Sequence, residues 1–328
     1  MKEESELCSM FKRAVNRLRD FKFAYVIYNF FHRRKLGHNQ PFYKKLQIKK
    51  PVYWNVSSED FANLPQQSPW LDEPGARETL LQDEKYLQLP LVVQQHLLQW
   101  MDYGFIILKN FLSPEEADAI NGEINLLLQQ KKVKPLANGK IMFAFKQSAL
   151  LKKIVSDERI TKLFEFIFQQ PVIPFQSINF LKGSQQRAHS DSIHMTTYPL
   201  GYLSAAWFAL EDIDDKNGSL FYYPGSHKLP YVLSPDFDHK SGLLQLDPDT
   251  NSRYEERMAA IIATGNLVKT DFCARKGDVF LWHANLVHGG NAIADMSRTR
   301  KSMVVHYFAR NVIKYHEISQ RPALLEIE

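Results

Sequence analysis

Residues 277–291 read GDVFLWHANLVHGGN, which places a short apolar run between two groups of turn residues. The run is Val279–Trp282; Lys276-Gly277 precedes it, and Gly289-Gly290 follows after a few residues. Apolar or alternating runs of this length, bounded by such residues, are typical of β-strands. Many short strands between Gly- and Pro-containing turns indicate a sandwich or barrel. Similar runs occur at 172–181, 204–210, 220–223, 267–274 and 303–308.

The sequence before residue 170 predicts helices around one buried strand. Residues 92–103 have the pattern of a short helix, and an apolar strand is expected at 104–108. Ser113-Pro114-Glu115-Glu116 combines an N-cap, a proline at the first helical position and early acidic residues, so a helix to about Gln130 is expected. The long insertion at 230–265 also contains a predicted helix, and insertions of this length are often lids or binding loops.

The basic residues are concentrated at the start of the chain. The 328 residues carry a net charge of +5, but residues 1–50 hold 13 Lys/Arg against 4 Asp/Glu, and the remainder is slightly acidic. Residues 5–36 lack Pro and Gly, so we expect a long helix that ends at Arg33, Arg34 and Lys35, before Gly37. We expect no specific nucleic-acid partner. Residues 11–50 instead suit a peripheral contact with an anionic membrane or a protein.

Composition excludes several other classes of protein. Two cysteines, Cys8 and Cys273, are too few for a disulfide framework or an all-cysteine zinc site. The first residues include Glu3, Glu4 and Glu6 in place of the basic and apolar regions of a secretory signal. Because no run of about 18 apolar residues occurs either, a cytoplasmic protein without a transmembrane helix is expected.

A candidate metal site begins at RAHSDSIH, residues 187–194. His189 and Asp191 are two residues apart, so on a strand both side chains would project from one face. An imidazole and a carboxylate placed in this way form two thirds of the 2-His-1-carboxylate triad of non-haem iron. The alternative for the pair taken alone is a surface turn. A third ligand would come from His283 or His288, and we prefer His288 because the glycines after it allow a tight turn.

A candidate anion site follows at RTRKS, residues 298–302. Arg300 and Ser302 are two residues apart, and an arginine with a hydroxyl suits a carboxylate at the end of a small diacid. The alternative is a solvated basic turn.

In order and spacing, these motifs resemble those of the phytanoyl-CoA dioxygenase family of Fe(II)- and 2-oxoglutarate-dependent oxygenases. The resemblance covers roughly residues 102–308. Any one of its motifs is common, but their occurrence in this order is specific. They are YGF at 103–105, the helix start at 113–116, HSD at 189–191, ALEDI at 209–213, NGSL at 217–220, YPGSH at 223–227, GD at 277–278, HG at 288–289, Asn291 and RKS at 300–302.

The resemblance implies an α+β fold in which a double-stranded β-helix, a jelly-roll or cupin-like barrel, has flanking helices and an N-terminal helical extension. The implied cofactors are Fe(II) and 2-oxoglutarate, with O2 as cosubstrate. His189, Asp191 and His288 would bind the iron, and no other catalytic side chain is expected. The residues expected to bind 2-oxoglutarate are Arg300, Ser302, Trp207 and Asn179. His194 and Gln186 are candidates for contact with substrate.

The expected activity is hydroxylation of an unactivated C–H bond in a small-molecule or carrier-linked metabolite, with release of succinate and CO2. The presence of Asp191 favours hydroxylation, because related halogenases have a small residue in its place. The alternative function is a catalytically silent barrel that acts as a binding or membrane-surface accessory protein. The expected domains are a basic, aromatic-rich helical extension at 1–50, a proline-containing linker or covering segment at 51–100, an oxygenase domain at 101–310 and a tail at 311–328.

Overall fold

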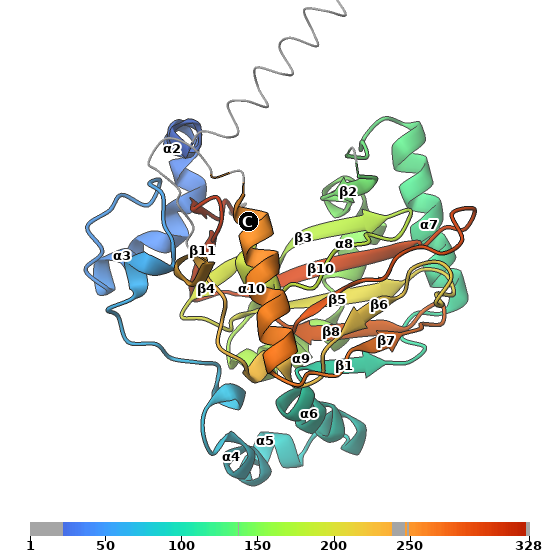
Figure 1. The fold of residues 1–328 in the computed structure, drawn as a ribbon, viewed down its shortest axis with the longest axis horizontal. Coiled ribbons are helices and arrows are strands. Elements are labelled where there is room, and N and C mark those ends of the chain that lie inside the picture. The colour runs from blue at the N-terminus through green and yellow to red at the C-terminus, as the bar shows by residue number, and fades with distance from the viewer. Residues whose placement is uncertain (1–21, 137, 238–246, 248, 326–328) are drawn as a thin grey trace, which may run out of the picture.

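The computed structural model combines helices with antiparallel sheets, in agreement with the α+β prediction (Figure 1). It describes residues 22–136, 138–237, 247 and 249–325. None of the helices within these ranges is long and apolar enough to cross a membrane. The helices are α2 (Lys22–Phe31), α3 (Gln40–Lys45), α4 (Ala76–Gln82), α5 (Glu84–Leu87), α6 (Leu91–Tyr103), α7 (Pro114–Gln129), α8 (Ala149–Val155), α9 (Glu158–Phe168) and α10 (Thr250–Thr264).

The largest sheet has six strands in the order β1-β8-β5-β10-β3-β2, with every neighbouring pair antiparallel. The predicted apolar runs in this sheet form strands because their side chains are buried on both of its faces. Ala206 and Phe208 of β5 face one core, whereas Ala205 and Trp207 face another. The strands are β1 (Phe105–Leu108), β2 (Lys140–Met142), β3 (Val172–Phe180), β5 (Leu203–Ala209), β8 (Val279–His283) and β10 (Ser302–Ala309).

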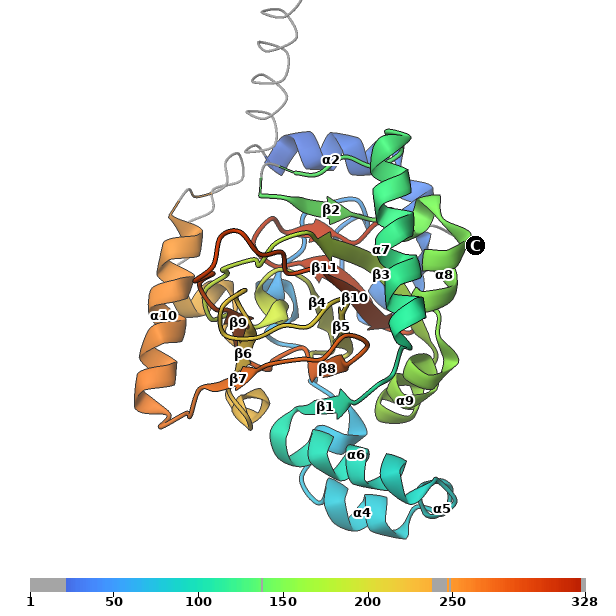
Figure 2. The same ribbon diagram turned by 90° about the vertical axis from the view of Figure 1, so that its right-hand side faces the viewer.

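A smaller sheet, β7-β6-β9, faces part of the large one (Figure 2). Leu220 and Tyr222 of β6 and Phe272 of β7 share an apolar core with Trp207 and Phe280 of the large sheet. Apolar side chains therefore fill part of the space between the two sheets and hold the sheets in a fixed arrangement next to the site. The strands are β6 (Leu220–Tyr222), β7 (Thr270–Phe272) and β9 (His288–Gly290).

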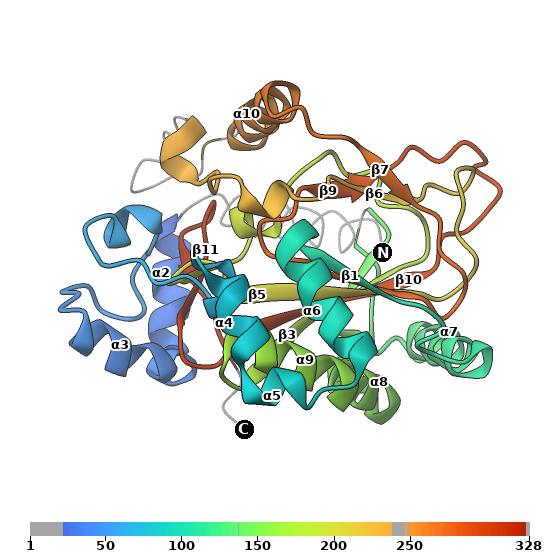
Figure 3. The ribbon, with the colours of Figure 1, turned by 90° about the horizontal axis from the view of Figure 1, so that it is seen from below.

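Helices cover the outer faces of both sheets (Figures 2 and 3). Residues of α7, α8 and α9 join the core on the outer face of the large sheet. The smaller sheet is covered by α10, whose Tyr254 and Met258 pack near Phe221 and Tyr223. The Ser113 hydroxyl accepts from Glu116 N, and the Glu116 carboxylate accepts from Ser113 N, so the predicted N-cap of α7 is a complete capping box.

The C-terminal segment belongs to the fold, so the prediction of a tail at 311–328 is wrong for its described part. β11 (Ile313–His316) pairs with β4 (Thr196–Tyr198) and with β12 (Arg321–Pro322) in a third sheet. Glu317 is fully buried; its carboxylate accepts from Ser58 N, Ser58 Oγ and Ser234 N. Because Val52, Val56 and Phe61 are also buried here, residues 51–75 form a covering segment and not a linker.

The predicted N-terminal helix ends earlier than expected. α2 ends before Arg33, and the chain continues as the 3-10 helix Arg33–Asn39, with Gly37 inside it, before α3. The physical reason is burial: Leu36 has no exposed surface and packs with Tyr43 in a core with the covering segment. The prediction for residues 5–21 lies outside the described residues.

The strand predictions at 104–108, 172–181, 204–210, 220–223 and 303–308 are confirmed within one or two residues, and 267–274 gave the shorter strand β7. Strands β2, β4, β9, β11 and β12 were not predicted. They have two to four residues, which is too few to show a periodicity in the sequence.

Gly277, just before β8, has a positive φ of +92°. A Cβ at this position would lie 2.2 Å from the backbone oxygen of Leu112, and Leu112 N donates to Gly277 O. We therefore expect Gly277→Ala to lower the free energy of unfolding by about 2–4 kcal/mol, because it adds both backbone strain and overlap. Chemical denaturation would measure the change.

Gly122 is the matched control for this substitution. It lies inside α7, and a Cβ there would meet nothing within 4 Å. Gly122→Ala should leave stability unchanged or raise it by up to about 1 kcal/mol, because alanine is the better helix former. Equal stability of the Gly277→Ala protein and the wild type would contradict this prediction. It would show that the backbone around Leu112 and residue 277 can shift to accept the Cβ without a cost in free energy.

Candidate active site

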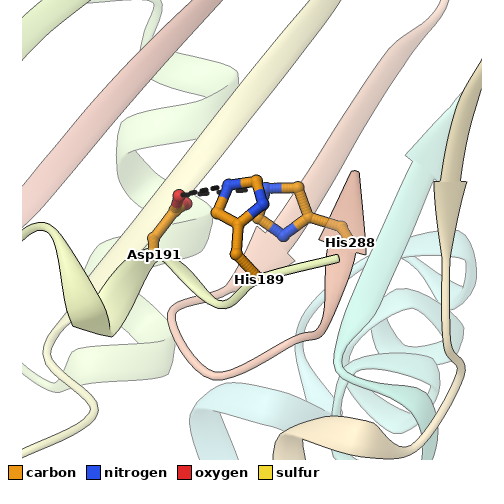
Figure 4. A group of neighbouring side chains, drawn as sticks. All are labelled: His189, Asp191 and His288. Carbon is orange, nitrogen blue, oxygen red and sulfur yellow. Dashed lines mark ion pairs between the residues drawn. The ribbon is translucent and has the colours of Figure 1, made fainter. Parts of the chain in front are cut away.

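Three buried side chains with metal-ligating atoms meet between the two facing sheets: His189, Asp191 and His288 (Figure 4). Their ligand atoms all lie within 4.8 Å of one another. His288 begins β9, and its backbone exchanges two hydrogen bonds of 2.9 Å with His189. This isolated bridge holds the two imidazoles next to each other, with ring centroids 4.5 Å apart.

The expectation that His189 and Asp191 lie on one strand is wrong. His189 forms only the single bridge, and Asp191 begins a 3-10 helix, Asp191–Ile193. The pair still converges because the chain turns immediately after the bridge, which brings Asp191 Oδ1 within 3.9 Å of the Nε2 atom of each ring. His189 and Asp191 therefore lie together as expected, but not on the strand that was expected to bring them together.

Hydrogen bonds leave one nitrogen of each imidazole facing the carboxylate. His189 Nδ1 lies 2.8 Å from Arg187 O, and His288 Nδ1 lies 2.9 Å from Leu286 O. Since a carbonyl only accepts, each Nδ1 carries the proton and each Nε2 has a lone pair. The two Nε2 atoms lie 3.9 and 3.8 Å from the same atom, Asp191 Oδ1.

The second carboxylate oxygen, Asp191 Oδ2, has partners of its own. It accepts from Trp282 Nε1 at 2.7 Å and lies 3.5 Å from His306 Nε2. Burial by itself would raise the pKa of Asp191, but the histidines around it, His288 and His306 foremost, hold that pKa well below its usual range. Asp191 is therefore ionised, with Oδ1 directed at the two histidines.

These donors fit a divalent iron ion. Burial, assisted by His288, lowers the pKa of His189 to about 3, so its imidazole stays neutral and can bind a metal at physiological pH. Two neutral imidazoles and one carboxylate leave a net positive charge on Fe(II), and a triad on one side of the ion leaves positions open for other ligands. The backbone carbonyls of Arg187 and Leu286 fix the rings, as outer partners of metal ligands commonly do.

The triad opens into a cavity of about 400 Å³. β3 and β10 supply alternate residues to its wall, and the smaller sheet supplies Leu220, His288 and Gly289. More than half of the lining residues are polar or charged. The polar and charged residues lining it are Asn138, Lys140, Gln176, Ser184, Gln186, His189, Asp191, His194, His288, Arg300, His306, His316 and Arg321.

Arg300 lines this cavity and is itself buried, with 3% of its surface exposed. Its Nε has no hydrogen-bond partner among the described residues, and its guanidinium lies 5.2 Å from the ring of Trp207. Burial lowers the pKa of Arg300 to about 10, which still leaves it charged at physiological pH. A buried cation of this kind requires an anion, and the cavity is where that anion can enter.

The other three residues expected to bind 2-oxoglutarate have different positions. Trp207 lines the cavity, and its buried Nε1 has no hydrogen-bond partner within the described chain. Ser302 is buried on β10. It lies two residues before Val304, so its side chain is on the same face of the strand as that of Val304, which lines the cavity. Asn179 is buried but faces away from it: the cavity receives its neighbours on β3, Ile178 and Phe180. Asn179 is not part of the site, and that prediction is wrong.

Both candidates for substrate contact line the cavity. Gln186 Nε2 lies 3.1 Å from His189 Nε2, and its Oε1 accepts from Lys140 Nζ at 3.3 Å. The ring of His194 lies 5.8 Å from that of His189 and 6.1 Å from that of His316. Gln186 thus faces the very nitrogen that a metal would take.

Several site residues were missed by the sequence analysis. His306 is the clearest, because it contacts Asp191. His306 lies at an alternate position along the same stretch as Arg300 and Ser302, so its side chain is on the same face of β10. Lys140, His316 and Arg321 also line the cavity, but they lie on the short strands β2, β11 and β12, which no sequence pattern revealed.

Two other buried histidines, His283 and His227, lie outside this cavity. His283, next to Trp282 on β8, places Nε2 3.1 Å from Asp72 Oδ2. His227 is buried near it, with ring centroids 5.5 Å apart, and its Nε2 lies 3.3 Å from Met101 O. The preference for His288 over His283 as the neighbour of the His189–Asp191 pair agrees with the structure.

A buried cluster of two histidines and one carboxylate, open to a cavity on one side, is the donor set of mononuclear non-haem iron oxygenases. Residues 100–300 match the family described as Phytanoyl-CoA dioxygenase (PhyH). The chain therefore belongs to the phytanoyl-CoA dioxygenase family, whose members are Fe(II)- and 2-oxoglutarate-dependent dioxygenases.

Two curated proteins show the range of its relatives. The chain is 25% identical to peroxisomal phytanoyl-CoA dioxygenase of Rattus norvegicus, over 62% of this chain and 64% of that protein. It is 26% identical to ectoine dioxygenase of Nocardia farcinica, over 64% of this chain and 76% of that protein. The chain thus spans a little under two thirds of the rat protein.

A solved structure shows the likeness of fold. The non-haem α-ketoglutarate-dependent carbocyclase SnoK from nogalamycin biosynthesis superposes with a TM-score of 0.56 at 17% identity. The match covers 74% of this chain and 96% of SnoK. At this identity the comparison speaks for the fold alone.

Proposed function

We propose that the protein is an Fe(II)- and 2-oxoglutarate-dependent hydroxylase, acting on an unactivated C–H bond of a small-molecule or carrier-linked metabolite with release of succinate and CO2. The observation that carries the proposal is one cavity with two features. His189 Nε2, His288 Nε2 and Asp191 Oδ1 converge at one point of its wall, and the buried guanidinium of Arg300, also in the wall, forms no ion pair with a described acidic residue. The facing sheets would then be the two halves of a double-stranded β-helix.

The residues have separate roles in this proposal. His189, Asp191 and His288 would hold Fe(II), and Arg300 would bind the distal carboxylate of 2-oxoglutarate, with Ser302 and Trp207 beside it. When bound, these groups supply the oxidising chemistry that couples decarboxylation of 2-oxoglutarate to attack on a C–H bond. The protein's own contribution is to orient them and to exclude water, for which Trp207, Leu220, Trp282 and Val304 provide an apolar wall.

The carboxylate of Asp191 favours hydroxylation over halogenation. Asp191 is ionised and hydrogen-bonded to Trp282, so it occupies the place where a halide would have to bind. A protein built for halogen transfer would have a small side chain there.

The charges of the cavity favour a substrate that carries an anionic group. Apart from Arg300, the cavity is lined by Lys140 and Arg321, and Asp191 is its only acidic residue among those described. A phosphate-bearing carrier, such as the coenzyme A of the rat relative's substrate, matches these cations better than a zwitterionic solute such as ectoine. We therefore favour a carrier-linked acyl substrate.

The experiment that tests the proposal measures succinate formed from 2-oxoglutarate. Purified protein with Fe(II) is screened against acyl-CoA thioesters and, for comparison, zwitterionic solutes. We expect one class of substrate to give succinate in equal amount to a hydroxylated product that contains one atom from O2. Binding of Fe(II) and 2-oxoglutarate without turnover of any compound would favour the alternative of a catalytically silent binding protein. Equimolar succinate and a chlorinated product in the presence of chloride would contradict hydroxylation.

A further inference from the structure

Most of the large apolar side chains of α2 are exposed. Phe31 is 74% exposed and Phe23 55% exposed, and Ile27, Tyr28 and Phe30 are exposed as well. At about 100° per residue, these five side chains form one continuous strip that covers roughly 160° of the helix. We call these five residues the α2 strip. Figures 1 and 2 show α2 at the edge of the molecule.

The opposite face of α2, which packs on the protein, contains polar residues. Lys22, Val26 and Asn29 are buried there. Lys22 Nζ donates to Gln320 Oε1 at 2.8 Å, and Asn29 Nδ2 donates to Tyr53 O at 3.5 Å. A surface helix normally buries its apolar side and exposes its polar side. In α2 the arrangement is reversed, which indicates that the strip has a further apolar surface to contact.

Basic residues predominate around the strip, although Glu59 lies near Lys22 and Asp60 pairs with Lys50. Residues 22–50 contain eight Lys/Arg and no Asp/Glu. The guanidinium of Arg33 lies 4.8 Å from the ring of Phe30, and its Nη1 donates to Phe30 O. The exposed cations nearest to it in sequence are Arg34, Lys44, Lys45 and Lys49.

This combination matches an anionic lipid surface. Aromatic side chains insert at the level of the lipid headgroups, and flanking lysines and arginines bind anionic headgroups while their stems cover apolar surface. The strip is also convex, being one side of a helix, and a bilayer can receive it without a preformed groove. A protein partner would need both a complementary groove and an acidic rim.

The helix α2 lies close to the cavity of the candidate active site. Tyr25 of α2, which is not part of the strip, packs against Arg321, with the guanidinium 4.6 Å from its ring. Arg321 in turn lines the cavity. A membrane bound by the strip would therefore lie on the same helix that contacts the cavity wall.

We propose that the α2 strip docks the protein on an anionic membrane, with the aromatic residues in the interface and the cations of residues 33–49 against the headgroups. Docking requires neither metal nor 2-oxoglutarate. Its test is therefore independent of the proposed oxygenase activity, and each proposal can fail without the other.

The test is co-sedimentation of the full chain with vesicles of phosphatidylcholine alone, or with about one third phosphatidylglycerol. We expect binding to the anionic vesicles, little binding to the neutral ones, and weakening as salt rises. Phe23→Ala combined with Phe31→Ala should lower the affinity about tenfold or more, because two exposed aromatic side chains leave the interface. Circular dichroism would verify that the variant is folded.

The matched control is Leu91→Ala combined with Val92→Ala. These residues on α6 are 75% and 55% exposed, and α6 lies at the other end of the molecule from α2 (Figure 1). Their removal should leave vesicle binding unchanged. Equal loss in both variants, or no loss in the α2 variant, would overturn the proposal; in the second case residues 1–21 or another segment would be the membrane contact. Absence of binding to any vesicle would also overturn it and would leave a protein or a second copy of this chain as the occupant.

Discussion

Replacing His189 and Asp191 together by alanine should abolish the visible absorption band that Fe(II) and 2-oxoglutarate form on the wild-type protein under anaerobic conditions. The two substitutions remove two of the three ligand atoms that converge within 4.8 Å. A single remaining imidazole, His288, cannot hold iron against water, so we expect Fe(II) affinity to fall by at least about 100-fold. The band is measured by anaerobic titration with 2-oxoglutarate.

A second histidine–aspartate pair provides the control. His283, which is buried on β8, lies 3.1 Å from Asp72 of the 3-10 helix Trp70–Asp72, and neither residue lines the cavity. The variant His283→Gln, Asp72→Asn should keep the band as long as circular dichroism shows it to be folded. A band that survives in the His189→Ala, Asp191→Ala protein, or one lost only in the control, would mean that the metal binds elsewhere.

The metal ligands could be predicted because they occur in short sequence motifs. The three-dimensional arrangement that brings them together could not be predicted from those motifs. His189 and His288 are 99 positions apart and meet through one pair of backbone hydrogen bonds. No local pattern specifies that pairing, since it depends on which strands face each other across the two sheets. The resemblance to a known family supplied this long-range information, whereas periodicity supplied only the strands.

The errors at Asn179 and His306 share one physical origin, which is the face of β3 or β10 on which each side chain lies. Along a strand, neighbouring residues face opposite sides, so an error of one position moves a side chain from cavity to core. Asn179 was assigned to the cavity but faces the other side, whereas His306 has the same parity as Arg300 and reaches Asp191. Following that alternation from Arg300 would have identified His306.

The N-terminal and C-terminal errors share another cause, which is burial by distant segments. Leu36 is buried with Tyr43 and Val56 in a core that also contains Ile313 and Tyr315. A single sequence cannot show that residues near 36 and near 313 pack together. The helix was therefore predicted to continue past Phe31, and the end of the chain was predicted to be a tail.

Arg300→Ala should raise the concentration of 2-oxoglutarate needed for half-saturation while leaving Fe(II) binding nearly unchanged. Arg300 is the buried cation of the cavity wall and has no ion pair with a described acidic residue. Charge-assisted hydrogen bonds are worth roughly 1.5–3 kcal/mol, so the expected increase is roughly 10- to 100-fold. Titration of the absorption band measures 2-oxoglutarate binding directly, and Fe(II) binding is measured separately without 2-oxoglutarate.

Two further variants distinguish specific binding from general charge. Arg298 is close in sequence, but its Nη1 pairs with Asp214 at 2.8 Å and it does not line the cavity, so Arg298→Ala should bind 2-oxoglutarate as the wild type does. Arg300→Lys keeps the charge but loses the two-pronged geometry, so its affinity should lie between those of Arg300→Ala and the wild type. Because burial lowers the pKa of Arg300 only to about 10, the difference between the wild type and Arg300→Ala should not depend on pH between 6 and about 9. Loss of Fe(II) binding in Arg300→Ala would instead show that Arg300 supports the metal ligands. An equal loss of 2-oxoglutarate affinity in Arg298→Ala would show that both arginines act only through general electrostatic attraction.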